Sequence, residues 1–190
     1  VRVPIWVKQG TMRLPPQRTT PIIAVGPGTG CAIFRAFFEE RHSTRLTNPT
    51  PSRDVFVFGC RHEHKDYLFR DEWHALRAEH TLDLLLVAFP GTSDIYIHMS
   101  YCTDHTPCRD QPRKVYVQHL MEQHARQLWE LIDREGAVFY LSGNAKNMPK
   151  DVRRAFKAIV VREGHLSEDE ADKYIRTLEL HDRFMTETWF

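Results

Sequence analysis

The sequence predicts an α/β protein in which a mostly parallel sheet of about five strands lies between two layers of helices. Short apolar runs, of the kind buried in parallel sheets, alternate along the chain with longer segments of helical periodicity. A glycine-rich turn over residues 26–30 joins the first buried run to the first helical segment. This alternation indicates a three-layer α/β/α fold, in which ligands bind at the carboxyl ends of the strands.

The strands are predicted from apolar runs that turn-forming residues interrupt. Residues 1–8 alternate as a strand does, with Val3, Ile5 and Val7 on one side, and a linker rich in proline and threonine follows. Each later run is continuously apolar, which favours burial on both faces of a sheet. These buried strands are expected over residues 21–25, 54–58, 82–89 and 136–141.

The helices are predicted from apolar residues at helical spacing and from their start signals. The first follows the glycine turn and carries Phe34, Phe37 and Phe38. Pro149 suits the first turn of a helix, where its missing N–H costs nothing, and Ser167 with Glu170 matches a capping box. The remaining helices are expected over 65–80, over 117–135, from Pro149 to Val160, and from Ser167 onward.

Composition and charge narrow the class of protein. The chain has 190 residues, 42% of them hydrophobic, and 26 basic residues against 25 acidic ones. The near balance of charge gives no reason to expect nucleic acid or a membrane surface as partner, and no apolar run is long enough to cross a bilayer. Four dispersed cysteines favour a reducing, cytoplasmic compartment. Because the chain begins at Val1 without a signal peptide, we expect it to be part of a longer protein.

The turn Gly26-Pro-Gly-Thr-Gly30 follows a buried strand and precedes a helix. Glycines let a phosphate approach the backbone, and the helix N-terminus offers free N–H groups and a positive dipole end. A tight strand-to-helix connection would produce the same pattern, and the spacing is not that of the common dinucleotide motif. Both interpretations are open at this point.

A basic segment, Cys108 to Gln118, follows the third strand and contains Arg109, Lys114 and Tyr116. A guanidinium, an ammonium and a phenol suit a phosphomonoester such as the 2′-phosphate of NADP(H). The alternative is a solvated basic loop.

Five motifs occur in order along the chain and carry a resemblance to a known family. They are Gly26-Pro-Gly-Thr-Gly30, Phe58-Gly-Cys-Arg61, Asp66-Tyr-Leu68, Lys114-Val-Tyr-Val-Gln-His119 and Gly143-Asn-Ala-Lys-Asn-Met148. Together they resemble the NADPH-binding domain of the diflavin reductases, which share the ferredoxin–NADP reductase module. The start of the chain and the ending Thr186-Glu-Thr-Trp189 are most similar to the branch that passes electrons to anamorsin in cytosolic iron–sulfur cluster assembly.

The resemblance implies roles for individual residues. It places Gly28, Thr29 and Gly30 around the pyrophosphate, with Arg61 nearby. The residues that would hold the 2′-phosphate and the adenosine are Cys108, Arg109, Lys114, Tyr116 and Gln118. Other positions expected to line the nucleotide are Asn144, Met148 and Asp151. Trp189 would cover the flavin ring and move aside for the nicotinamide.

Three residues depart from the family pattern. Ser142 stands where many relatives have a cysteine near the hydride-transfer centre, and Glu187 replaces an aspartate there. Cys108 replaces a serine that helps to hold the 2′-phosphate. The resemblance makes Ser142, Glu187 and Trp189 the candidate catalytic residues. The substitutions at Ser142 and Glu187 are expected to tune the rate and not to abolish it, because hydride transfer depends mainly on alignment.

Residues 90–107 form an insert relative to the family, and we expect a surface loop there. Cys102, His105 and Cys108 could in principle ligate zinc. Only three ligands are present and their spacing matches no common zinc motif, so no metal is expected.

The resemblance implies hydride transfer from NADPH to FAD, followed by electron transfer through FMN to a protein acceptor. Residues 1–20 would be the end of an upstream FAD-binding domain and a linker, and residues 21–190 the NADP(H)-binding domain. FAD and FMN would be bound by upstream domains of the same protein. The alternatives are a reductase of haem monooxygenases, a non-catalytic nucleotide-binding scaffold and a stand-alone NADP-binding domain.

Overall fold

The structure is a computed structural model, and it describes residues 3–6, 10–47, 53–89, 96–98 and 115–190. Within these residues the sheet has six strands in the order β4-β3-β2-β1-β5-β6. Five of them are parallel and β4 is antiparallel, so the predicted, mostly parallel α/β sheet is confirmed. The strands are β1 (Ile22–Val25), β2 (Val55–Gly59), β3 (Leu84–Ala88), β4 (Tyr96–His98), β5 (Val138–Asn144) and β6 (Phe184–Trp189).

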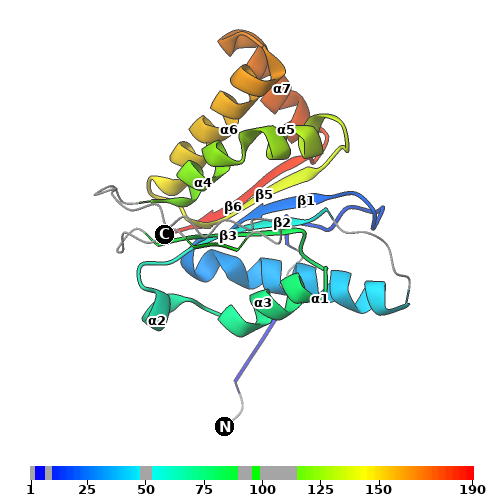
Figure 1. Cartoon of the computed structure of the whole chain (residues 1–190), viewed down its shortest axis with the longest axis vertical. Helices are drawn as coiled ribbons and strands as arrows, with labels where there is room; N and C mark the ends of the chain where they lie inside the picture. Colours follow the sequence, from blue (N-terminus) through cyan, green and yellow to red (C-terminus); the bar gives the residue numbers. More distant parts are fainter. Residues whose placement is uncertain (1–2, 7–9, 48–52, 90–95, 99–114) are drawn as a thin grey trace.

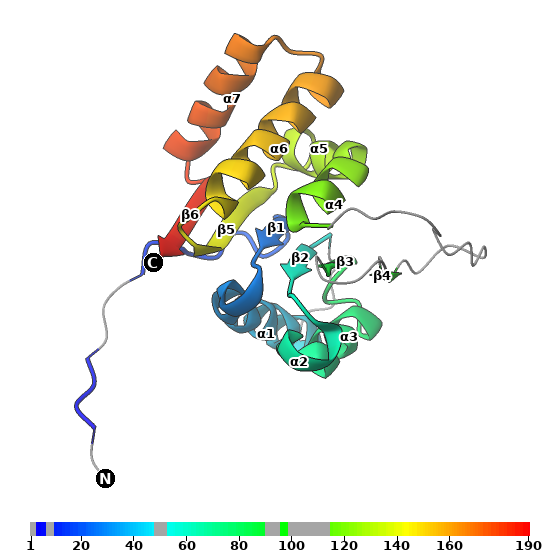
Figure 2. The ribbon, with the colours of Figure 1, turned by 90° about the vertical axis from the view of Figure 1, so that its left-hand side faces the viewer.

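Helices cover both faces of the sheet, as Figures 1 and 2 show. One layer contains α1 (Cys31–Thr47), α2 (Glu63–Asp66) and α3 (Arg70–Ala78). The other contains α4 (Val117–Gln123), α5 (Ala125–Asp133), α6 (Met148–Gly164) and α7 (Glu168–Leu180). No helix in the described part of the chain has both the length and the apolar character needed to cross a membrane.

The apolar runs are continuous because each strand is buried on both sides. In β1, Ile23 and Val25 belong to the core beneath α4–α7, whereas Ile22 and Ala24 belong to the core beneath α1 and α3. All four are fully buried. This double burial explains why the sequence shows no alternation within the strands.

Two predicted helices are each divided in the structure. The segment predicted over 65–80 forms α2 and α3, separated at Phe69, whose φ of 57° is left-handed. The Arg35 guanidinium lies 4.7 Å from the Phe69 ring centroid, and the Trp73 indole N–H donates to the Leu68 carbonyl at 2.7 Å. The segment predicted over 117–135 forms α4 and α5, separated at His124, whose φ and ψ of −103° and 20° are not helical.

Three terminal and edge segments also differ from the prediction. Residues 3–6 form no strand, because their side chains are exposed and no described strand lies beside them. The insert is not a loop throughout, since residues 96–98 form β4, which pairs antiparallel with β3. The parallel edge strand β6 was not predicted, because its six residues mix apolar side chains with Thr186, Glu187 and Thr188.

Candidate nucleotide-binding site

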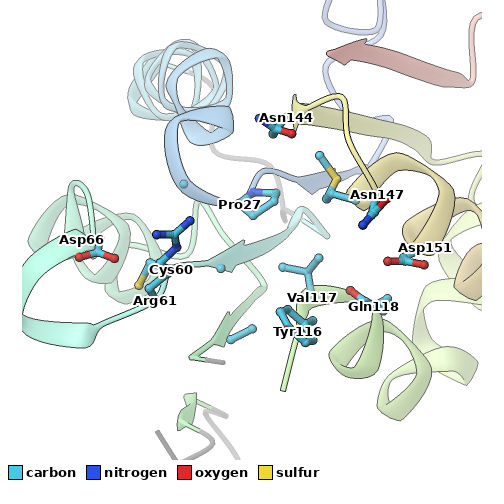
Figure 3. A pocket seen from close by; sticks show the side chains of 14 residues that line it. Pro27, Cys60, Arg61, Asp66, Tyr116, Val117, Gln118, Asn144, Asn147 and Asp151 are labelled. Carbon is cyan, nitrogen blue, oxygen red and sulfur yellow. The ribbon is translucent and has the colours of Figure 1, made fainter. Parts of the chain in front are cut away.

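A cavity of about 650 Å³ opens at the carboxyl ends of β1, β2, β3 and β5 (Figure 3). The strand order reverses between β1 and β5, because β2 and β3 extend to one side and β6 to the other. Seven of the predicted cofactor residues line the cavity, namely Gly28, Arg61, Tyr116, Gln118, Asn144, Met148 and Asp151. Seven other residues line it as well: Pro27, Gly59, Cys60, Asp66, Ala88, Val117 and Asn147.

Most of the additional residues adjoin a predicted one. Pro27 precedes Gly28, and Asn147 precedes Met148 as the N-cap of α6. The sequence could therefore have predicted these lining residues if each motif had been assigned to the site as a whole, and not only single positions within it. Ala88 had no such signal, because it lies in a buried run at the end of β3.

The glycine turn divides its residues between the cavity and the sheet. Gly28 lines the cavity with a left-handed φ of 57°, which glycine adopts without strain. Gly30 is buried, and its N–H donates to the Pro27 carbonyl at 3.1 Å. A β-carbon on Gly30 would lie 2.1 Å from the Ser142 carbonyl oxygen, so this glycine lets the turn approach β5. Neither Gly30 nor the exposed Thr29 lines the cavity, and only Gly28 of the predicted cradle does so.

The end of β2 brings a thiol and a guanidinium to the cavity wall. Cys60 is 6% exposed, and burial raises the pKa of its thiol to about 12, with smaller contributions from Asp66 and Glu63. The thiol is therefore neutral at physiological pH and is not an activated nucleophile. Arg61 is exposed and lies beside Cys60 on the cavity wall (Figure 3), so its guanidinium can supply positive charge there.

Two helices begin at the cavity. Tyr116 is the N-cap of α4 and Asn147 is the N-cap of α6. The first N–H groups of a helix lack partners within that helix and carry partial positive charge, which suits an anionic ligand. Asp151 lies in the first turn of α6, where its carboxylate accepts a hydrogen bond from Arg154 at 2.9 Å.

The candidate catalytic residues lie on the neighbouring pair of strands. Ser142 on β5 is opposite Glu187 on β6, and Asn144 is opposite Trp189. Ser142 is 1% exposed, whereas Trp189 is 41% exposed. The Thr11 hydroxyl donates to the Glu187 carboxylate at 3.2 Å. The structure thus brings Ser142 and Glu187 together, beside the cavity and outside its lining.

Part of the predicted site lies outside the described residues. This applies to Cys108, Arg109 and Lys114, and to Cys102 and His105 of the possible zinc trio. Among the residues that are described, no group of three or more His, Cys, Asp or Glu side chains could hold a metal ion.

Comparisons with known proteins agree with this geometry. Residues 24–154 match the family described as the oxidoreductase NAD-binding domain. The chain is 39% identical over 188 residues to NADPH-dependent diflavin oxidoreductase 1 of Xenopus laevis, which covers 99% of this chain and 27% of that protein. It is 40% identical over 189 residues to the Mus musculus protein of the same name, and the match covers 100% of this chain and 28% of that protein. It is 38% identical over 189 residues to NADPH–cytochrome P450 reductase of Drosophila melanogaster, and the match covers 100% of this chain and 25% of that protein. The chain spans about a quarter of the length of these relatives.

Proposed function

The chain belongs to the oxidoreductase NAD-binding domain family, and we propose that it binds NADPH in the cavity at the carboxyl ends of its parallel strands. The resemblance to the NADPH-binding domain of diflavin reductases is confirmed by the family match and by the relatives. The observation that carries the proposal is the position of the cavity where the strand order reverses. Nucleotides bind at this point in open α/β sheets.

The lining chemistry fits a dinucleotide diphosphate. A β-carbon at Gly28 would meet no atom within 4 Å, so the backbone of the turn is open to a ligand. Arg61 offers a guanidinium to the phosphates, and the start of α6 offers N–H groups. Met148 and Val117 supply apolar surface, and the Gln118 amide can hydrogen-bond the adenosine.

The 2′-phosphate would be held by the segment that leads into α4. Tyr116 lies at the cavity and offers a hydroxyl and an aromatic face. By resemblance, Arg109 and Lys114 add the charge that distinguishes NADPH from NADH, and Cys108 replaces a serine that helps to hold the same phosphate. This assignment makes the preference for NADPH a property of the Cys108–Gln118 segment.

The hydride-transfer end would lie along β5 and β6. When bound, NADPH supplies a hydride and FAD accepts it. Ser142 and Glu187 are register partners on these strands. The partly exposed Glu187 carboxylate can orient the nicotinamide through hydrogen bonds, whereas the Ser142 hydroxyl is buried and would have to be uncovered first. Trp189 lies opposite Asn144, which lines the cavity, and its indole would cover the flavin ring until NADPH displaces it.

The complete protein would be a diflavin reductase. FAD and FMN would be bound by other domains of the same protein, and residues 1–20 would be the end of the FAD-binding domain and a linker. The exposure of Val3, Ile5 and Trp6, at 71%, 84% and 75%, supports this because such side chains gain from a covering domain. The acceptor would be an anamorsin-like protein of cytosolic iron–sulfur cluster assembly, as in the branch that the motifs resemble.

The similarity to cytochrome P450 reductase supports a second candidate, in which the acceptor is a haem monooxygenase. The two acceptor classes can be separated by supplying the complete protein with NADPH. Faster electron transfer to an iron–sulfur protein favours the first candidate, and faster transfer to a haem monooxygenase favours the second.

The binding site can be tested by titrating NADPH into the isotope-labelled chain and following the backbone amides by NMR. The amides of Gly28, Arg61 and Asn147 should shift. A second hollow, of about 700 Å³ at the amino ends of β5 and β6, provides an internal control, and its Gly136 and Asp182 should stay unchanged. Shifts confined to the second hollow, or none at all, would refute the proposed function.

A further inference from the structure

Tyr116 occupies a special position because it both lines the cavity and starts a helix. Its backbone is extended, with φ −111° and ψ 167°, and its carbonyl accepts the N–H groups of His119 and Leu120 at 3.0 and 3.4 Å. The residue is 42% exposed. Figure 3 places its side chain beside those of Val117 and Gln118 on the cavity wall.

His119 contacts Tyr116 in two ways. Its Nδ1 accepts the backbone N–H of Tyr116 at 3.1 Å, so the proton of the neutral imidazole lies on Nε2. The two rings lie 5.8 Å apart between centroids at an angle of 61°. His119 stands at the third helical position, where glutamate or glutamine usually closes a capping box. Imidazole is an uncommon group for this task, and it reaches the ring as well as the backbone.

The helix itself has other anchors. Val117 and Leu120 are 4% and 0% exposed and pack in the core beneath α4. Val115, on the other side of Tyr116, is 8% exposed and belongs to the same core. Apolar burial therefore fixes the path of the chain before and after Tyr116. The half-exposed Tyr116 lacks such burial, so the contacts from His119 act chiefly on its orientation.

We propose that His119 is a positioning residue for nucleotide binding, which holds the backbone and ring of Tyr116 ready at the cavity wall. This inference rests on the proposed NADPH site. A ring that is already ordered loses less conformational freedom when a ligand stacks on it or bonds to its hydroxyl. Without the acceptor at His119, that ordering would have to take place on binding.

The test compares His119→Leu with His119→Gln. Leucine removes the acceptor, whereas glutamine restores an oxygen at the position where capping boxes place one. His119→Leu should raise the Kd for 2′-phospho-AMP about three- to tenfold, as expected for ordering one further side chain on binding. His119→Gln should stay within about twofold of the wild type.

A matched control breaks a capping box far from the cavity. The Ser167 backbone N–H donates to the Glu170 carboxylate at 2.8 Å at the start of α7. Glu170→Leu should lower the melting temperature without changing the affinity. Should His119→Leu also lower only the melting temperature, or should both His119 variants lose affinity equally, the proposal is wrong.

A second measurement needs no nucleotide, and so separates this inference from the proposed function. Hydrogen exchange at the Tyr116 amide should be slow in the wild type and in His119→Gln, and faster in His119→Leu. Equal exchange in all three would overturn the positioning role. If exchange at the Tyr116 amide is slow but the chain binds no nucleotide, the contact between His119 and Tyr116 exists. The proposed NADPH site, and with it the positioning role of His119, would then be wrong.

Discussion

Replacing Gly30 with alanine should force the glycine turn away from β5 and destabilise the chain. The new β-carbon would lie 2.1 Å from the Ser142 carbonyl oxygen and 2.7 Å from its carbonyl carbon. Both are backbone atoms of a buried strand, so they cannot rotate away as the end of a side chain can. Overpacking costs about 1–3 kcal/mol, and contact with backbone places this site at the upper end, about 3 kcal/mol. In a domain of this size, that corresponds to a fall in Tm of about 6–12 °C.

Thermal unfolding followed by circular dichroism measures this change, with Gly10→Ala as the control. A β-carbon at Gly10 would meet no atom within 4 Å, so this variant should stay within about 0.5 kcal/mol of the wild type. The affinity for NADPH should fall in Gly30→Ala, because the turn that carries Gly28 moves. A Tm within about 2 °C of the wild type would show that the close approach to Ser142 does not constrain the turn.

Three further predictions concern other parts of the proposed site. Arg109→Ala should weaken NADPH binding about tenfold or more and leave NADH binding nearly unchanged, as measured by calorimetry; an equal loss for both would make Arg109 structural. Deleting residues 90–107 should lower the free energy of unfolding by about 1–3 kcal/mol, because the pairing of β4 with β3 is lost. The affinity for NADPH should be retained, and a large loss of affinity would place the insert in the site. Trp189→Ala, in a protein that includes its FAD domain, should raise turnover with NADH relative to NADPH and slow NADP+ release in stopped-flow kinetics. Unchanged cofactor preference would show that Trp189 does not gate the flavin.

The parts of the fold predicted from sequence are those that depend on local patterns. The four buried strands and the start of α7 follow from apolar runs and from the Ser167–Glu170 capping box. The division at Phe69 has no such local signal, because neither glycine nor proline marks the left-handed residue. Arg35 and Trp73 contact that region through tertiary packing, which the sequence does not reveal.

The candidate site shows the same division. Its position follows from motifs at the ends of strands, because parallel strands bring their carboxyl ends to one edge of the sheet. The juxtaposition of Ser142 with Glu187 depends on the register between β5 and β6, and β6 shows no continuous apolar run. The role of Gly30 likewise follows from a close approach between distant segments. Register and close approach are properties of the folded chain.

We propose that this domain recognises NADPH through its 2′-phosphate. Calorimetric titration of the chain with 2′-phospho-AMP and with AMP isolates this contact, because the two ligands differ only in that phosphate. Charge-assisted hydrogen bonds contribute about 1.5–3 kcal/mol each, so 2′-phospho-AMP should bind at least about a hundredfold more tightly. Equal affinities for the two ligands would show that the domain does not recognise the 2′-phosphate.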